Sequence, residues 1–301
     1  MTRRVLVTGV TGFIGKHTLS PLRELGFDVH VIGRSAPVDP AVTFHPADLF
    51  DLAGASKVVY AAKASHLLHL AWDTEPGRFW NSPINLDWVG ASLNLVRAFA
   101  EQGGVRAVLA GTCAEYRWGA DDPLDEKRSE LAPGTLYGVS KDALRRIVAS
   151  YADTASLSVA WGRIFFLYGP DEKPGRLVSD AIAAFATGQP FATTDGNQRR
   201  DFMHVADVAG AFAALVASDA RDAVNIASGH AIPVRSLLEA IARETGGEKL
   251  LRLGARPRPA GDPPVIEAAV DRLHHEVGFR PRHTLSSGLA ETVKRWRRVR
   301  H

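Results

Sequence analysis

A tyrosine and a lysine four residues apart, Tyr137 and Lys141, are the side chains of this sequence best placed to do chemistry. If the segment is helical, residues at i and i+4 share one face, so an ammonium group would lie near a phenol. A phenol with a pKa of about 10 is a poor acid or base at neutral pH, and a nearby cation favours its ionised form. The pair therefore predicts a proton-transfer site, with Thr112, at the end of the preceding apolar strand, as its third member.

A glycine-rich segment near the N-terminus predicts a dinucleotide site. The segment Thr8–Gly15 follows an apolar strand and opens a helical pattern. Glycines at this spacing allow a tight turn, close approach of the backbone to a pyrophosphate and close packing of helix on strand, while the helix N-terminus attracts the anion. We expect cofactor contacts from Gly9, Thr11, Gly12, Phe13, Ile14 and Gly15.

The end of the second strand bears on which dinucleotide is bound. NAD-binding proteins usually place an acidic residue there for the ribose hydroxyls. This chain has no acid in Val31–Ser35, and Arg34 can grip a 2′-phosphate in a bidentate manner, with Ser35 as a further donor. The segment therefore predicts NADP (NADPH), with NAD as the remaining possibility and an exposed loop arginine as the alternative. Asp48 and Leu49, after the third strand, are candidates for the adenine end, although Asp48 could simply stabilise a turn.

These residues need a regular scaffold, and short apolar runs alternate with helical patterns up to about residue 170. The expected strands are Arg4–Thr8, Val29–Gly33, Val42–His45, His66–Leu70, Ala107–Ala110 and Ser158–Ile164. The expected helices between them are Phe13–Leu25, Asn85–Glu101 and Tyr137–Ala152. This alternation predicts an α/β fold with a doubly wound parallel sheet of the Rossmann type, with ligands at the carboxyl ends of the strands.

Beyond residue 170, longer helices and loops rich in proline and glycine predict a smaller, mostly helical substrate lobe. We expect an NAD(P)-binding domain at 1–170, to which the chain returns around 205–228, and a substrate-binding lobe at 171–301. The expected helices are Arg176–Thr187, Val205–Ala217, Val234–Thr245, Arg272–Val277 and Leu285–Val299.

Composition and charge exclude several classes of protein. The 301 residues are 46% hydrophobic and 23% charged, which excludes a disordered chain, a collagen-like fibre and, with Cys113 alone, a disulfide scaffold. No apolar run is long enough to span a bilayer, so we expect a cytoplasmic protein without a membrane partner. The net charge is only +3, and the one dense basic run, Lys294–Arg298 with Arg300, ends a helical pattern. We therefore expect no nucleic-acid partner, and no residues have the spacing of a metal site.

Several motifs occur in the order found in one enzyme family. They are Thr8–Gly15, His69–Ala71, Asn85, Tyr137–Lys141, Gly162–Pro170, Arg200–Val205 and Asn225–Gly229. The chain resembles an extended short-chain dehydrogenase/reductase of the nucleotide-sugar epimerase, dehydratase and ketoreductase branch. The resemblance implies that Tyr137 is the acid/base, that Lys141 lowers its pKa and holds the nicotinamide ribose, and that Thr112 orients the sugar oxygen.

The resemblance also implies further contacts and partners. Additional cofactor contacts would come from Leu70, Ala71, Trp72, Asn85 and Phe165. The nucleotide-diphosphate sugar would meet Asp73, Arg78, Thr112, Phe166, Arg176, Arg200 and Arg258. His204, which follows the Arg200 motif, is expected to be structural rather than a metal ligand. A homodimer with a four-helix interface, formed by Asn85–Glu101 and Tyr137–Ala152, is the assembly that the family suggests.

Two departures from the family pattern narrow the activity. Related dehydratases carry Asp and Glu directly after the threonine, whereas this chain has Cys113 and Ala114, which argues against dehydration. Glu115 comes one position late and is expected to point away from the site, on the opposite face of a strand, with a structural role. Phe166 replaces an asparagine of many sugar epimerases, which places a UDP-galactose-type pocket in doubt.

The main expectation is an NADP(H)-dependent reductase of a 4-keto, 6-deoxy nucleotide sugar, with hydride transfer at C4 and Tyr137 as acid/base. Arg34 favours it, because a cofactor that is consumed and released is commonly NADPH. The alternative is an NAD(P)-dependent nucleotide-sugar 4-epimerase, and a more remote one is a dinucleotide-binding protein without turnover. That last class is expected to lack the tyrosine–lysine pair, which this chain keeps.

Overall fold

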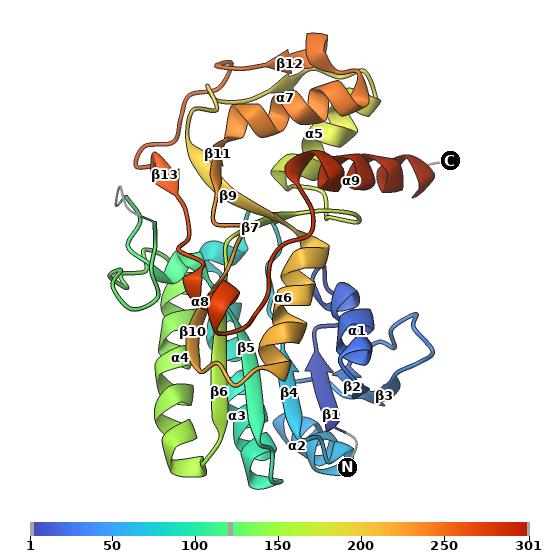
Figure 1. Cartoon of the computed structure of the whole chain (residues 1–301), viewed down its shortest axis with the longest axis vertical. Helices are drawn as coiled ribbons and strands as arrows, with labels where there is room; N and C mark the ends of the chain where they lie inside the picture. Colours follow the sequence, from blue (N-terminus) through green and yellow to red (C-terminus); the bar gives the residue numbers. More distant parts are fainter. Residues whose placement is uncertain (1–2, 120–122, 300–301) are drawn as a thin grey trace.

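A seven-stranded parallel sheet forms the larger lobe of the computed structural model, which describes residues 3–119 and 123–299 (Figure 1). Arg300 of the basic run therefore lies outside the described residues. The strand order is β3-β2-β1-β4-β5-β6-β10. Because the order reverses between β1 and β4, the carboxyl ends of these strands border the crevice where such folds bind ligands. The strands are β1 Arg3–Thr8, β2 Phe27–Gly33, β3 Thr43–Pro46, β4 His66–His69, β5 Arg106–Thr112, β6 Ser158–Ile164 and β10 Asp222–Ile226.

Helices cover both faces of this sheet. Apolar residues of α1 and α6 pack with Val5 and Val7 of β1 on one face. Those of α2, α3 and α4 pack with Leu6 on the other face. Strands that are buried on both sides explain why their sequences read as continuous apolar runs. The helices are α1 Gly15–Glu24, α2 Leu52–Ala62, α3 Ile84–Glu101, α4 Leu136–Ala155 and α6 Val205–Ala217.

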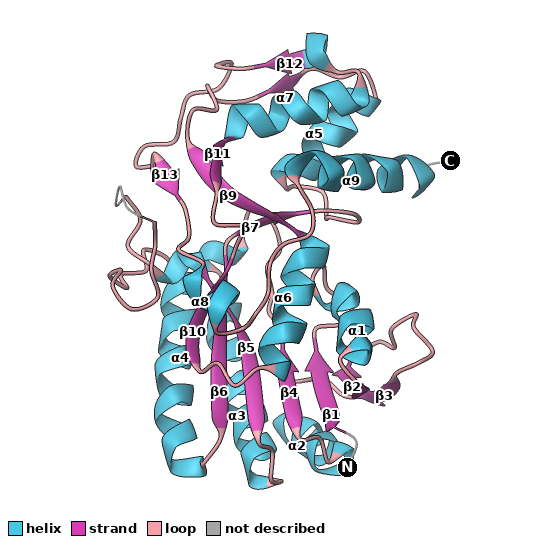
Figure 2. Ribbon diagram, in the orientation of Figure 1, coloured by secondary structure: helices cyan, strands magenta, loops and turns pink. Residues whose placement is uncertain are grey.

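The smaller lobe combines three main helices with short strands. A four-stranded sheet contains β7, β9, β11 and β13, and β8 pairs with β12. In Figure 2, β7 and β9 lie between the large sheet and the upper helices. The elements are β7 Phe166–Tyr168, α5 Leu177–Ala186, β8 Phe191–Ala192, β9 Arg199–His204, β11 Ala231–Pro233, α7 Val234–Thr245, β12 Leu251–Arg252, β13 Val265–Ile266 and α9 Leu285–Val299. Helix α8, Asp271–His275, packs against β10 of the large sheet.

The predicted fold class is confirmed, and the elements that were missed are weakly marked in sequence. Helices α6, α7 and α9 begin and end where the helical patterns do. Helix α2 was not predicted, because only Ala55, Val59 and Ala62 form its buried side. The strands of the smaller lobe were also missed. Several contain two or three residues, too few to show an alternating pattern.

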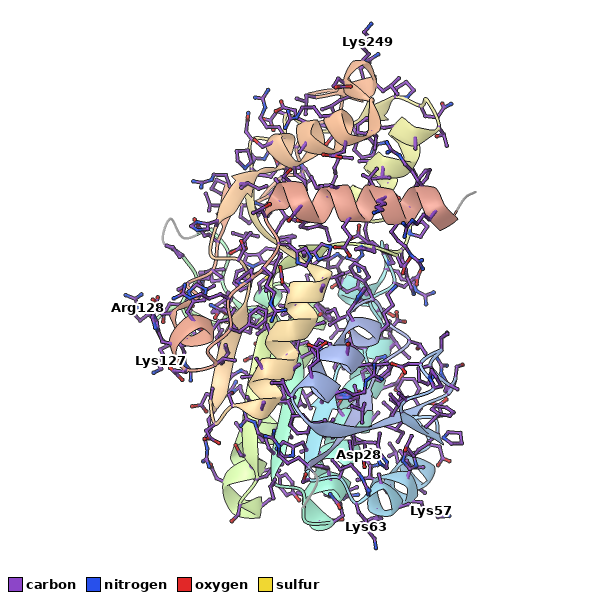
Figure 3. All side chains as sticks on the ribbon, turned by 45° about the vertical axis from the view of Figure 1, so that its right-hand side comes forward. Asp28, Lys57, Lys63, Lys127, Arg128 and Lys249 are labelled. Atoms are coloured by element: carbon purple, nitrogen blue, oxygen red, sulfur yellow. The ribbon has the colours of Figure 1, made fainter. Side chains whose placement is uncertain are left out.

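Basic side chains point in different directions from the surface. Figure 3 shows Lys57 and Lys63 at the lower end, Lys127 and Arg128 at one side and Lys249 at the upper end. These five cations therefore share no common face. Within residues 3–119 and 123–299, no helix combines the length and the apolar character needed to cross a membrane.

Candidate active site

Thr112, Tyr137 and Lys141 come together at the carboxyl end of β5. Thr112 ends that strand, and Tyr137 and Lys141 lie on the first two turns of α4. All three are buried, and the hydroxyls of Thr112 and Tyr137 are hydrogen-bonded. The Lys141 ammonium donates a hydrogen bond to the carbonyl oxygen of Ala110 at 2.8 Å. The structure thus assembles the three predicted side chains around one point of the sheet edge.

Local caps and close packing orient the start of α4. The Thr135 hydroxyl accepts a hydrogen bond from the backbone N–H of Gly138 at 3.2 Å and caps the helix. Gly138 also allows α4 to approach the short helix η2, Cys113–Glu115, because a Cβ there would lie 2.5 Å from the Ala114 carbonyl oxygen. The position of Tyr137 is therefore set by its immediate sequence neighbours.

Burial controls the protonation of the tyrosine and the lysine. It raises the pKa of Tyr137 well above the usual value, against the hydrogen bond with Thr112, which lowers it. Burial lowers the pKa of Lys141 to about 7, against the charge of Glu115, which raises it. From the sequence, the Lys141 cation was expected to lower the Tyr137 pKa. In the structure the net shift of Tyr137 is upward, so its phenol keeps its proton at neutral pH and is ready to donate it.

An aromatic wall encloses the tyrosine. The ring centroids of Trp72, Phe79 and Trp80 lie 6.4, 5.0 and 5.8 Å from that of Tyr137. The Lys141 ammonium lies 3.7 Å from the ring centroid of Trp72 and makes a cation–π contact with it. Trp118 extends the wall from the β5 side, since its ring lies 6.4 Å from that of Trp80. Trp118 was not predicted, because nothing in its own segment marks it as part of the site.

Asn85 anchors the loop that carries this wall. Its amide nitrogen donates to the carbonyl oxygens of Phe79 and Ser82, both at 2.8 Å. Its amide oxygen accepts a hydrogen bond from the Trp72 indole at 2.8 Å. From the sequence, Asn85 was expected to contact the cofactor. The structure gives this buried amide three protein partners, so it positions the loop.

The predicted substrate residues near this loop contact one another. Asp73 and Arg78 form an ion pair at 3.6 Å, and the Arg78 side chain is 70% exposed. Arg176, immediately before α5, donates to the Thr74 carbonyl oxygen at 2.7 Å. Its guanidinium lies 5.3 Å from the Phe79 ring centroid. Arg176 therefore connects the smaller lobe to the loop above the tyrosine.

Close packing requires two of the three glycines in the turn after β1. Gly9 has a φ of +74°, and a Cβ there would lie 2.6 Å from the Ala71 backbone nitrogen. A Cβ on Gly15 would collide with the Gly9 carbonyl and with Val10. Packing therefore explains these two glycines. Gly12 is exposed, and a Cβ there would meet only the Gly9 oxygen, at 3.0 Å, so packing does not account for the third glycine.

The other predicted cofactor residues lie along the same sheet edge. Arg34 and Ser35 are exposed immediately after β2. Asp48 accepts a hydrogen bond from the Phe50 backbone at 3.0 Å, as the turn alternative expected, and Leu49 is buried. Leu70 and Ala71 follow β4, and their backbone N–H groups both donate to the Thr8 hydroxyl. These hydrogen bonds fix the loop after β4 to β1.

Two predicted arginines of the smaller lobe share a carboxylate. Asp262 binds the Arg200 guanidinium and lies 3.4 Å from the Nε of Arg258. Arg200 also lies 5.7 Å from the Phe166 ring centroid. The ion-pair alternative is thus realised through Asp262. The other acid considered for it, Asp201, instead accepts hydrogen bonds from the backbone and hydroxyl of Ser228 and from the backbone of Gly229.

A buried ion pair behind Thr112 was not predicted. Glu115 lies in η2 rather than on a strand, and its carboxylate accepts hydrogen bonds from the Thr112 backbone at 2.9 Å and from Arg163 Nε at 2.8 Å. Arg163 also donates to the Tyr116 hydroxyl. The expected structural role of Glu115 agrees with these contacts. Phe165, expected near the cofactor, is buried in a cluster with Cys113 and Tyr116.

Comparisons with known proteins place the whole chain. Residues 5–227 match the model of the NAD dependent epimerase/dehydratase family. The UDP-glucose 4-epimerase of Lacticaseibacillus casei is 28% identical over 321 residues, covering 97% of this chain and 96% of that protein. The Thermus thermophilus UDP-glucose 4-epimerase, solved in complex with NAD, is 26% identical with a TM-score of 0.85, covering 98% and 99% of the two chains. MoeE5, solved with UDP-glucose and NAD, is 30% identical with a TM-score of 0.84, covering 99% and 100%. Together with the geometry of its site, these matches show that the chain belongs to the NAD dependent epimerase/dehydratase family of nucleotide-sugar enzymes.

Proposed function

We propose that this protein is a nucleotide-sugar 4-epimerase that uses a nicotinamide dinucleotide. The observation that carries the proposal is the assembly of Thr112, Tyr137 and Lys141 at the sheet edge beside the glycine turn. Relatives that match almost the whole chain are UDP-glucose 4-epimerases by name. The reductase expectation depended on Arg34, and Phe166 counted against a UDP-galactose-type pocket, whereas the comparisons favour the 4-epimerase alternative.

The chain's own groups supply proton transfer and orientation. Reversible hydride exchange with C4 of the sugar is the chemistry that the bound nicotinamide would supply. Tyr137 Oη accepts the proton of the C4 hydroxyl as that carbon is oxidised. After the 4-keto sugar has rotated to present its opposite face, Tyr137 returns the proton to the same oxygen as C4 is reduced. Thr112 holds the same oxygen by a hydrogen bond. Burial alone keeps the Tyr137 phenol protonated, whereas the first step requires the phenolate. The positive charge of an oxidised nicotinamide bound at this edge would favour that phenolate.

The residues next to Thr112 argue against dehydration. Cys113 and Ala114 are both buried and apolar in character, and neither carries a carboxylate that could remove or return a second proton. Glu115 is committed to Arg163, Trp161 and the Thr112 backbone. A single acid/base at one carbon is what epimerisation at C4 requires.

We infer that the cofactor is NADP, with its 2′-phosphate at Arg34. Arg34 and Ser35 are exposed directly after β2, and no acid occupies residues 33–36. Two solved relatives contain NAD, so selection of NADP here would depend on these local residues. The substrate's diphosphate would bind Arg176, Arg200 and Arg258, with Arg200 exchanging Asp262 for the anion.

An epimerisation assay with a tyrosine variant tests the function. The protein is supplied with UDP-glucose, and UDP-galactose is quantified by chromatography while the absorbance of reduced cofactor is followed. We expect product without net cofactor consumption. Tyr137→Phe should lower kcat by about 10²–10⁴-fold, because it removes the acid/base, and should leave substrate binding in place. Tyr151→Phe, on the same helix α4, is the matched control and should keep full activity.

The opposite results would decide against the proposal. Stoichiometric oxidation of NADPH by a 4-keto nucleotide sugar, with no 4-epimer formed from UDP-glucose or UDP-glucuronic acid, would establish the reductase instead. Normal turnover by Tyr137→Phe would remove the proposed mechanism.

A further inference from the structure

Three potential metal ligands from distant parts of the chain meet where the two lobes join. His204 precedes α6, His283 precedes α9 and Glu291 lies on α9. Figure 1 shows the upper end of α6 below α9. One potential ligand atom from each side chain lies within 4.8 Å of the others. From the sequence, no such cluster was found and a structural role was expected for His204, because no local spacing signals contacts that only the tertiary fold creates.

The environment of His204 is unusual for a structural histidine. The residue is 2% exposed, and neither ring nitrogen has a hydrogen-bond partner among the described residues. Its ring lies 4.1 Å from that of His283, measured between centroids. Burying polar atoms without hydrogen-bond partners costs free energy. A ligand that binds one of these nitrogens would remove part of that cost.

His283 lies between two carboxylates. Its Nδ1 is 3.0 Å from Asp207 and its Nε2 is 3.3 Å from Glu291. A neutral imidazole carries one ring proton and can donate to only one of them. Asp207 is the fixed partner, since it also accepts hydrogen bonds from the backbone N–H groups of Arg282 and His283. Donation to Asp207 leaves the Nε2 lone pair directed at Glu291. Metal-binding histidines are oriented by a carboxylate in this way.

We propose that His204, His283 and Glu291 bind one Zn²⁺ ion, with water in the fourth position. Two nitrogens and a carboxylate are ligands that zinc accepts at about 2.0–2.2 Å in a tetrahedral arrangement. Such ligand atoms lie about 3.4 Å apart. The Glu291 side chain, 53% exposed, is free to close the wider spacing. The charges of Asp207 and Glu291 balance that of the ion.

Of the three proposed ligands, Glu291 lies at the surface. Glu291 lines a surface pocket of about 410 Å³ together with His17, whose buried Nε2 also has no hydrogen-bond partner within the described part of the chain. The cations of the pocket include Lys294 and Arg295, and Arg295 pairs with Asp171 at 2.9 Å. Affinity for the ion therefore depends on the two histidines and the two carboxylates. Its bound form would fix α9 to the start of α6 and so join the lobes.

Metal binding by the whole, untagged protein tests the proposal. Chelator-treated protein is titrated with Zn²⁺ by calorimetry, thermal unfolding is recorded with and without the ion, and Co²⁺ is added as a spectroscopic probe. We expect one Zn²⁺ per chain, a higher Tm with the ion and the visible bands of four-coordinate Co²⁺. Glu291→Gln and His283→Gln should each weaken Zn²⁺ binding by at least about tenfold. Mutating residues that only hydrogen-bond to a metal ligand already lowers metal affinity by about 10–100-fold. His230→Ala, at an exposed histidine elsewhere, should bind as the wild type does.

Two results would overturn the proposal. One is a Tm that Zn²⁺ leaves unchanged together with no stoichiometric binding, which would leave His283 as a structural contact between Asp207 and Glu291. The other is equal Zn²⁺ affinity in the wild type and both ligand variants. Neither readout depends on sugar turnover, so the outcome is separate from that of the epimerase assay.

Discussion

Single residues at this site have protonation states set by burial more than by their neighbours. Lys141 is 3% exposed, and burial brings its pKa from 10.5 to about 7. The unfolded chain keeps the higher pKa. Between pH 7 and pH 10.5 the unfolded state therefore binds more protons at this residue than the folded state does. The contribution of Lys141 to the free energy of unfolding must rise with pH across that window and be most unfavourable below it.

The Lys141→Met variant tests this dependence on pH. It removes the buried titratable group, so its free energy of unfolding, relative to wild type, should be highest near pH 6 and should fall as the pH approaches 10. Urea denaturation of both cofactor-free proteins at several pH values measures the difference. Lys57→Met, at an exposed lysine of α2, should show no such trend. A flat difference would mean that Lys141 keeps an ordinary pKa in the fold, and a difference that grows with pH would mean that the fold raises this pKa; either result would contradict the prediction.

The site residues that could be predicted from the sequence are those placed by local spacing, whereas the residues that were missed are placed by tertiary contacts. Tyr137 and Lys141 share one helix, and the three glycines share one turn, so spacing alone places them. The Glu115–Arg163 pair depends on the parallel register of β5 and β6, which no local pattern reveals. The His204 cluster depends on how α9 returns to α6. Asp262, which forms an ion pair with Arg200, lies in an irregular loop.

At the scale of elements, the unit β1–α1–β2 was predictable because each step is local. An apolar strand, a glycine turn, a helix and a second strand follow one another with few residues between them. The long helices of the smaller lobe were predictable for the same reason, and α7 ends at Gly246, which has a φ of +74°. Strands such as β8 and β12 exist only because they pair with each other, so tertiary contact defines them.

The end of β2 places Arg34 where it could bind the 2′-phosphate of NADP. The variant Arg34→Ala tests this role. We expect wild type to bind NADP⁺ more tightly than NAD⁺ in calorimetry. The variant should lose affinity for NADP⁺ by about 10–100-fold, since a hydrogen bond to a charged group contributes about 1.5–3 kcal/mol, and should bind NAD⁺ unchanged. Arg128→Ala, at a distant exposed arginine, is the control. Tighter binding of NAD⁺ by the wild type would contradict the role given to Arg34.

At the scale of the whole molecule, the candidate site lies between the larger lobe, built on the parallel sheet, and the smaller, mostly helical lobe. The larger lobe supplies Thr112 from β5, Tyr137 from α4 and the glycine turn after β1, whereas Arg176 reaches from the smaller lobe to the loop above Tyr137. Under the proposed function, the smaller lobe would set the sugar specificity while Tyr137 keeps its role as acid/base. This division explains why a fold and a reaction class follow from sequence more readily than the identity of the sugar.

The outer surface of α3 and α4 leads to a prediction about assembly. These adjacent helices expose Leu86, Val139 and Ile147, with 60%, 47% and 48% of each residue accessible. Exposed apolar side chains on two neighbouring helices are typical of a surface that pairs with its own copy about a twofold axis. We therefore expect a homodimer with a four-helix interface.

Light scattering after size exclusion should give the wild type twice the chain mass of 32.5 kDa. Ile147→Glu buries a charge in the expected interface, so it should give the monomer mass while its circular dichroism stays that of the folded protein. Val38→Glu, at a fully exposed apolar residue outside both helices, should remain dimeric. If the wild type is monomeric at every concentration, or if Ile147→Glu still dimerises, then these two helices do not form the interface. In either case, the exposed apolar residues of α3 and α4 would be ordinary surface positions.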